Sequence, residues 1–113
     1  MELQYTELEN GVRLITLIGT LDMQGTFSVE VQFARLCAGE NALVLVDLSK
    51  VPYLSSIGIP MLINTARSVA SHGGKMGLVG PIYDVHRVLE ITGVPQIIPV
   101  YHDFDTAVAE IIK

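Results

Sequence analysis

The stretch from Leu45 to Ile63, LVDLSKVPYLSSIGIPMLI, constrains the fold more than any other part of the chain. It begins within an apolar run, Val44 to Leu48, which is typical of a covered strand, and it ends in a helical pattern. The turn between them contains Ser55 and Ser56. Such a turn leaves peptide N–H groups unpaired at the helix start, where a hydroxyl can cap them and an anion is favoured. Ser56 is therefore the first functional candidate.

A helix is predicted directly after the two serines. Pro60 fits its first turn, where a missing N–H costs little, and this places the helix start near Ser55 to Gly58. Gly73 and Gly74 are placed to end it. Its apolar face consists of Ile59, Leu62, Ile63, Ala66, Val69 and Ala70.

The segment before this stretch predicts two strands and one helix. Leu3 to Leu8 and Val12 to Leu17 are strand-like, and the Asn-Gly pair between them is a strong hairpin signal. Thr26 to Cys37 then predicts a helix that Gly39 ends. Its apolar residues at roughly helical spacing are Phe27, Val31, Phe33 and Leu36.

The segment after the stretch predicts two more strand and helix pairs. The strands are Lys75 to Val79 and Ile97 to Val100, and Pro81 to Thr92 is the first helix. Asp103 or Asp105 caps a final helix, whose apolar residues are Ala107, Val108, Ile111 and Ile112.

The resulting order, β-β-α-β-α-β-α-β-α, predicts a single α/β domain over residues 1–113. We expect a mixed sheet of four to five strands, with parallel later strands and helices mainly on one face. The N-terminal hairpin strand is expected at an edge. In such sheets the working loops gather at the carboxyl ends of the parallel strands, which here predicts that Asp22 and Ser56 lie close together.

Composition narrows the function classes. A formal net charge of −5 argues against nucleic acid or an anionic membrane as a partner, and favours a protein. The single cysteine, Cys37, excludes an internal disulfide, and no Cys/His spacing resembles a zinc site, so we expect no metal and no cofactor. The polar start MELQYTELEN and the lack of a long apolar run predict a cytoplasmic domain.

The expected docking surface combines small, neutral and apolar residues with few charges, a mixture that suits another protein. The sequence does not decide whether Met23 and Met61 belong to this surface or to the core. The candidate residues are Asp22, Met23, Gln24, Gly25, Ser55, Ser56, Ile57, Gly58, Met61, Asn64 and Thr65.

Five segments resemble motifs of the STAS domain family, of the anti-sigma factor antagonist type, in the family's order. LIGTLD is similar to L-x-G-x-L-D, VDLSKV to hydrophobic-D-L-S-x-V, and YLSSIGI to F-M-D-S-S/T-G-L. VLEITGV is similar to L-E-L-T-G-L. The segments are Leu17 to Asp22, Val46 to Val51, Tyr53 to Ile59, Gly73 to Leu78 and Val88 to Val94.

This resemblance implies a non-enzymatic, phosphorylation-switched binding module. The family's phosphorylated serine falls on Ser56, and Ser55 is the alternative. In the family an acid usually precedes the phosphorylated serine, and in this chain Ser55 occupies that position. Asp22 is a candidate to substitute for that acid in space. The implied partners are an anti-sigma factor that is also a serine kinase and a PP2C-like phosphatase.

Three other interpretations stay open from the sequence. Ser56 can be a simple helix cap, and the domain can be a constitutive STAS adaptor in a signalling scaffold or a lipid-transport complex. A weak homodimer is also open. A small enzyme is disfavoured, because His72, His86 and His102 are widely separated and no phosphate-binding glycine motif is present. Cys37 is expected to be a small core side chain.

Overall fold

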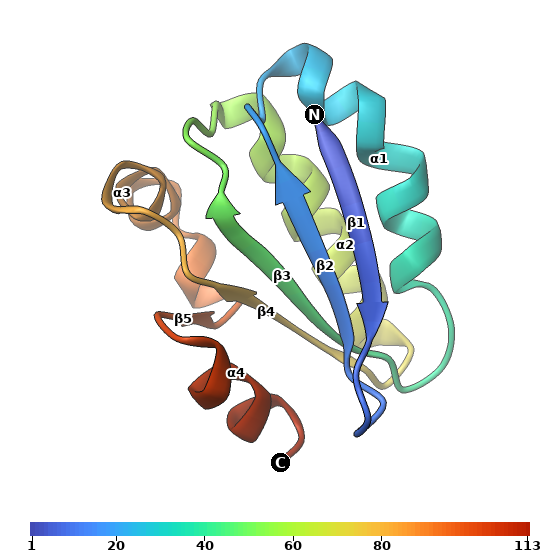
Figure 1. Ribbon diagram of the computed structural model, residues 1–113. Helices are drawn as coiled ribbons and strands as arrows, with labels where there is room; N and C mark the ends of the chain where they lie inside the picture. Colours follow the sequence, from blue (N-terminus) through green and yellow to red (C-terminus); the bar gives the residue numbers. More distant parts are fainter.

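The computed structural model describes every residue from Met1 to Lys113 and shows one five-stranded sheet in the order β1-β2-β3-β4-β5 (Figure 1). β1 runs antiparallel to β2, and the remaining neighbours are parallel. The predicted mixed sheet, with the hairpin strand at an edge, is therefore confirmed. The strands are β1 (Glu2–Glu7), β2 (Arg13–Ile18), β3 (Leu43–Lys50), β4 (Lys75–Val79) and β5 (Val100–Tyr101).

Three of the four helices share one face of the sheet. α1 (Met23–Cys37), α2 (Ile59–Ser71) and α3 (Tyr83–Ile91) contribute to the larger core cluster of 23 buried residues. α4 (Phe104–Ile111) packs on the opposite face, where its Ala107 and Ile111 join a cluster of five. In Figure 1, α4 lies in front of the sheet and α2 behind it.

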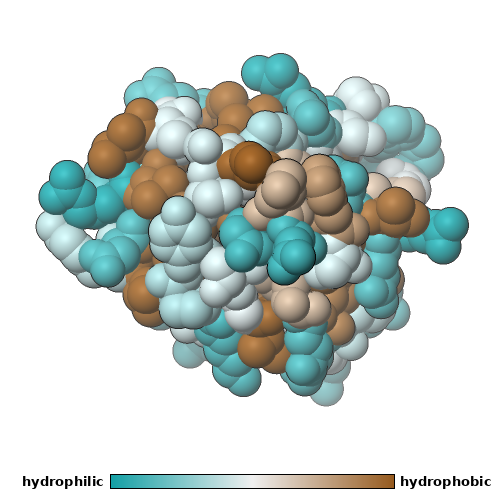
Figure 2. All heavy atoms as spheres, turned by 90° about the horizontal axis from the view of Figure 1, so that it is seen from above, coloured by the Kyte–Doolittle hydropathy of each residue, from teal (hydrophilic) through white to brown (hydrophobic).

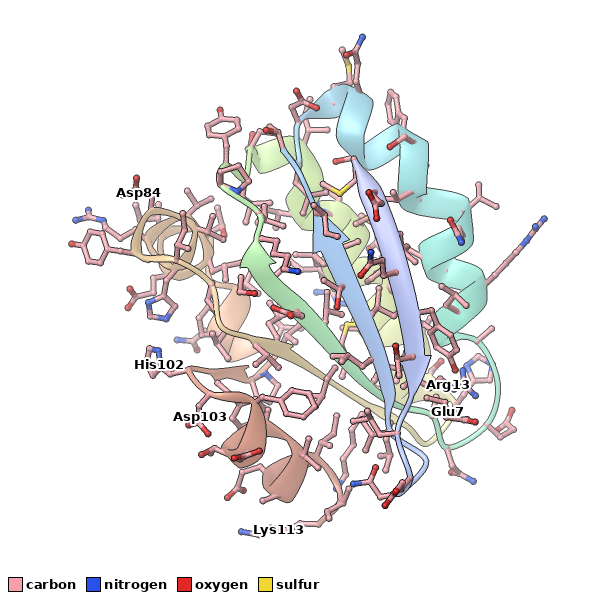
Figure 3. All side chains as sticks on the ribbon, in the orientation of Figure 1. Glu7, Arg13, Asp84, His102, Asp103 and Lys113 are labelled. Atoms are coloured by element: carbon pink, nitrogen blue, oxygen red, sulfur yellow. The ribbon has the colours of Figure 1, made fainter.

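Local hydrogen bonds explain the hairpin and the end of α1. Gly11 adopts a φ of +83°, and the peptide N–H of Leu8 donates to the oxygen of Val12 at 2.8 Å. Arg13, on β2, donates to the oxygens of Leu36 and Ala38 at 3.0 and 2.6 Å. These bonds satisfy carbonyl groups that the end of a helix leaves unpaired, and Figure 3 shows Arg13 beside this end of α1.

The first helix differs from its sequence prediction. It begins at Met23 instead of Thr26, because the Asp22 side chain accepts a hydrogen bond from the peptide N–H of Gly25 at 2.8 Å and caps the helix earlier. Phe27 and Val31 are 64% and 61% exposed, so they do not join the core. The residues of α1 that are buried in the core cluster are Val29, Phe33 and Cys37.

The predicted strand Ile97 to Val100 is also misplaced. A short 3-10 helix, Val94–Gln96, precedes it, and β5 contains only Val100 and Tyr101. Pro99 has no N–H to donate to β4, which limits pairing on this side of the sheet.

The helix starts agree better with the sequence. Asp103, not Asp105, caps α4, since its carboxylate accepts from the peptide N–H of Thr106 at 2.9 Å. Pro60 stands in the first turn of α2 as predicted, after a 3-10 turn at Ser56–Gly58.

Candidate functional site

Two loops meet at the carboxyl edge of the sheet. Leu21, which follows β2, forms an isolated parallel bridge with Leu54, which follows β3. The peptide N–H of Leu21 donates to the oxygen of Tyr53 at 2.9 Å, and the N–H of Ser55 donates to the oxygen of Leu21 at 3.0 Å. Asp22 is one residue beyond Leu21, and Ser56 is two residues beyond Leu54. The structure thus brings together the loops that the sequence predicted to converge.

The two neighbouring serines have different surroundings. The Ser55 hydroxyl donates to the oxygen of Leu21 at 3.1 Å and accepts from the peptide N–H of Ile57 at 3.3 Å. Ser55 is half-buried and caps the 3-10 turn that opens at Ser56. Ser56 is exposed, and its hydroxyl has no hydrogen bond within the chain. The cap that the sequence allowed at either serine is therefore Ser55, which leaves Ser56 free.

Asp22 caps the N-terminus of α1, the helix that follows it. Its carboxylate oxygen Oδ1 accepts from the N–H of Gly25, and it makes no hydrogen bond to Ser55 or Ser56. Gly25 is required here, because a Cβ at this position would overlap the backbone oxygen of Thr20. Asp22 thus fixes the start of α1.

The candidate docking surface at this edge is mixed in character. Met23 and Ile57 are 53% and 46% exposed, whereas Met61 is only 5% exposed and belongs to the core. Met61 is thus removed from the docking surface, because the first turn of α2 points it inward. Figure 2 views this edge from above and shows apolar side chains interspersed with polar ones. Gln24 is exposed, and Gly25 and Gly58 are buried. Asn64 and Thr65 lie further along α2, in a groove that Ala34 and Ala38 at the end of α1 also line.

Sequence reasoning missed Tyr53, which is 57% exposed and lies next to the bridge at Leu54. The sequence could have indicated it, because this aromatic residue stands two positions before the serine pair, in a loop at the carboxyl edge. The loop after β4 begins at Gly80, whose N–H donates to the oxygen of Tyr101 at 2.8 Å and continues the pairing of β4 with β5.

The remaining chemical candidates do not assemble into a site. The rings of His86 and His102 lie 5.6 Å apart, and His86 lies 3.5 Å from Glu90, but no three potential metal ligands gather anywhere in the chain. Figure 3 shows His102 next to Asp103, at the start of α4 and away from the serine loop. Burial raises the pKa of Cys37 to about 12, so its thiol stays protonated in the folded protein.

Comparison with known proteins identifies the family. The family model described as the STAS domain matches residues 5–107. The chain belongs to the STAS domain family. None of the helices of this STAS domain combines the length and apolarity that crossing a membrane requires.

Relatives of known name are similar over part or most of the chain. A Thermotoga neapolitana protein, provisionally named an anti-sigma factor antagonist, is 37% identical over 73 residues, which span 65% of this chain and 64% of that protein. The anti-sigma F factor antagonist of Paenibacillus polymyxa is 24% identical over 93% of this chain and 91% of its own length.

A solved structure confirms the fold. The crystal structure of an anti-sigma factor antagonist from Mycobacterium paratuberculosis superimposes with a TM-score of 0.89 at 23% identity, covering 99% of this chain and 94% of that one.

Proposed function

We propose that this STAS domain is an anti-sigma factor antagonist of the bacterial cytoplasm, which binds an anti-sigma factor serine kinase without being an enzyme itself. The names of the two relatives support this class of partner. In this proposal the kinase phosphorylates Ser56 and is thereby released, and a PP2C-like phosphatase restores binding. The docking surface consists of Asp22, Met23, Gln24, Tyr53, Ser55, Ser56, Ile57, Asn64 and Thr65, while Gly25 and Gly58 are buried in the segments that carry it.

One observation supports Ser56 above all others as the modified residue. Ser56 is exposed and its hydroxyl forms no hydrogen bond, while the hydroxyl of Ser55 donates one hydrogen bond and accepts another. A kinase must reach the acceptor oxygen and remove its proton, which is easier for a hydroxyl that holds no other partner. Phosphorylation of Ser55 would require breaking its bond to Leu21.

The expected effect of phosphorylation is electrostatic. A phosphate adds roughly −1.5 to −2 charges, and the only charged member of the docking surface, Asp22, is itself acidic. Across a packed interface such a group is hydrated and without a partner, and about 3 kcal/mol of lost binding energy is more than a hundredfold in affinity. The domain should keep its fold, because Ser56 lies outside the core.

Solved structures of another protein are consistent with a switch that preserves the fold. SpoIIAA has been solved in its unphosphorylated and its phosphorylated form, and this chain resembles both, with TM-scores of 0.78 and 0.69 at 15% and 13% identity. Those structures concern SpoIIAA alone, and they motivate the same measurement on this chain.

The test combines labelling with affinity. We incubate the domain with candidate kinase-type anti-sigma factors and ATP, locate the phosphate by mass spectrometry, and measure affinity by calorimetry before and after. We expect phosphate on Ser56, no label in Ser56→Ala, and normal labelling of Ser55→Ala when the variant is folded. An affinity unaffected by phosphate on Ser56, or a phosphorylated domain that unfolds, contradicts the proposal.

A second candidate is a constitutive adaptor, which has the same fold but no switch. Ser55 in place of the family's usual acid favours it. The STAS domain of a SulP transporter from Vibrio cholerae also superimposes, with a TM-score of 0.70 at 21% identity over 86% of this chain and 77% of that one. The labelling experiment separates the two, since an adaptor binds its partner while Ser56 stays unmodified by every kinase tried.

A further inference from the structure

The outer face of α1 carries an apolar ridge that nothing in the chain covers. Met23, Phe27 and Val31 recur every four residues and are 53%, 64% and 61% exposed. Ala34 is also exposed on this face. The side chains of α1 that point away from the sheet in Figure 3 extend into open space. Apolar side chains that neighbour one another on a surface form a candidate face for contact with another protein.

The only charged side chains of α1 border this ridge. They are Glu30 and Arg35, both are exposed, and neither forms an ion pair within the chain. At about 100° per residue the two are about 140° apart around the helix axis. They consequently lie on opposite sides of the ridge, one acidic and one basic.

We propose that this face of α1 binds a second copy of the same chain, with the two α1 helices parallel about a two-fold axis. In heptad terms Phe27, Val31 and Ala34 occupy positions d, a and d, with Glu30 at g and Arg35 at e. In a parallel pair a residue at g faces the residue at e that is five positions later in the other helix. Glu30 of each copy then meets Arg35 of the other, which gives two equivalent ion pairs by symmetry.

An antiparallel arrangement does not match the charges. In it the g sides of the two helices face each other, and so do the e sides. Glu30 would then face Met23 and Glu30 of the second copy, and Arg35 would face Ser28 and Arg35. No opposite charges meet, so the pattern on this helix favours the parallel pair.

The side chains of the ridge also differ in size. The small side chain of Ala34 follows the larger Phe27 and Val31, which lets two helices approach closely along the second half of α1. The contact covers about two heptads, so we expect a weak dimer that forms at high protein concentration. Its centre near Val31 lies about 12 Å along the helix from Met23, the residue that it shares with the proposed docking surface.

The test exchanges the two charges. Sedimentation equilibrium on wild type over a wide concentration range should show reversible dimers. Glu30→Arg and Arg35→Glu should each weaken association about tenfold or more, since each places like charges opposite each other. The double variant should recover wild-type association. An equimolar mixture of the two single variants should form mixed dimers, because their charges are complementary.

Two controls sharpen the outcome. Phe27→Ser should abolish association without lowering the thermal midpoint, because Phe27 is exposed. Ala34→Cys should form a disulfide-linked dimer under mild oxidation in the parallel pair, while the buried Cys37 stays unreactive. A wild type that stays monomeric at the highest concentration reached overturns the proposal, and so does a double variant no better than the single ones. Neither result affects the proposed role of Ser56, which the labelling experiment measures separately.

Discussion

The hydroxyl of Ser55 donates a hydrogen bond to the backbone oxygen of Leu21, 34 residues earlier in the chain, at 3.1 Å. The same hydroxyl accepts from Ile57 and so caps the turn that carries Ser56. One side chain therefore attaches the serine loop to the loop that starts α1. It adds to the two backbone hydrogen bonds that already join these loops, from Leu21 to Tyr53 and from Ser55 to Leu21.

Ser55→Ala should lower the free energy of unfolding by about 1–2 kcal/mol, because it leaves the N–H of Ile57 uncapped and removes one bond to Leu21. Ser55→Thr, which retains the hydroxyl, is the matched control and should lose less. Urea denaturation at neutral pH measures both. Equal losses in the two variants would mean that the hydroxyl contributes nothing.

Met61→Ala and Met23→Ala should separate the core from the surface. Met61 is 5% exposed, so its truncation should cost about 2–4 kcal/mol through the cavity that it leaves. Met23 is 53% exposed, so its truncation should change stability by less than about 0.5 kcal/mol. Only Met23→Ala should weaken kinase binding without unfolding the domain. A stable Met61→Ala variant would contradict the inward position of this side chain.

Gly25→Ala should be among the most damaging single changes in α1. The added Cβ overlaps the backbone oxygen of Thr20, and a backbone contact cannot move aside as a flexible side chain can. We expect a loss of at least about 2 kcal/mol, measured by thermal unfolding. Gln24→Ala, at the neighbouring exposed position, is the control and should be neutral. Alanine tolerated at residue 25 would show that the Thr20 loop can shift.

Asp103→Asn should make the thermal midpoint of the protein depend less on pH in the acid range. The hydrogen bonds from the backbone N–H and then the side chain of Thr106 hold the pKa of Asp103 below its ordinary value of 3.8. A lowered folded-state pKa stabilises the protein fully above the unfolded pKa, and this contribution disappears as the pH falls through the folded pKa. Thermal midpoints measured between neutral pH and strong acid should fall less steeply in the variant. Asp105→Asn, which lacks the bonds to Thr106, serves as the control.

Cys37 should resist alkylation in the folded protein. Burial raises its pKa to about 12, so the reactive thiolate is nearly absent at neutral pH. Iodoacetamide followed by mass spectrometry should label it slowly in buffer and rapidly in concentrated urea. Rapid labelling of the native protein would mean that α1 opens frequently, since Cys37 is only 2% exposed.

The order of strands and helices could be predicted because each element carries its own local signal. Alternation and the Asn-Gly pair mark the hairpin, and glycine and proline mark the helix ends. The predictions fail where spacing alone cannot choose a face. Phe27 and Phe33 both fit a helical period in the sequence, yet only Phe33 points into the core. The last strand starts later than predicted, at Val100, because Pro99 has no N–H with which to pair with β4.

The site was predictable in its location but not in its details. The sequence indicated that Asp22 and the serine loop converge, because both follow parallel strands. It left open whether Asp22 would cap a helix, as it does through Gly25, and whether Met61 would belong to the surface or to the core, where it lies. Tyr53 was overlooked because an exposed aromatic residue in a loop has no periodic signal.

The sequence by itself determined the elements, their order and the family, since these depend on local periodicity, turn residues and short motifs. Only the tertiary structure decided which of the two adjacent serines is free. That choice depends on a carbonyl oxygen, that of Leu21, which is distant in sequence and reaches Ser55 only when β2 and β3 lie side by side. A hydroxyl forms its bonds with whichever groups the fold places next to it, and no pattern of neighbouring residues specifies those groups.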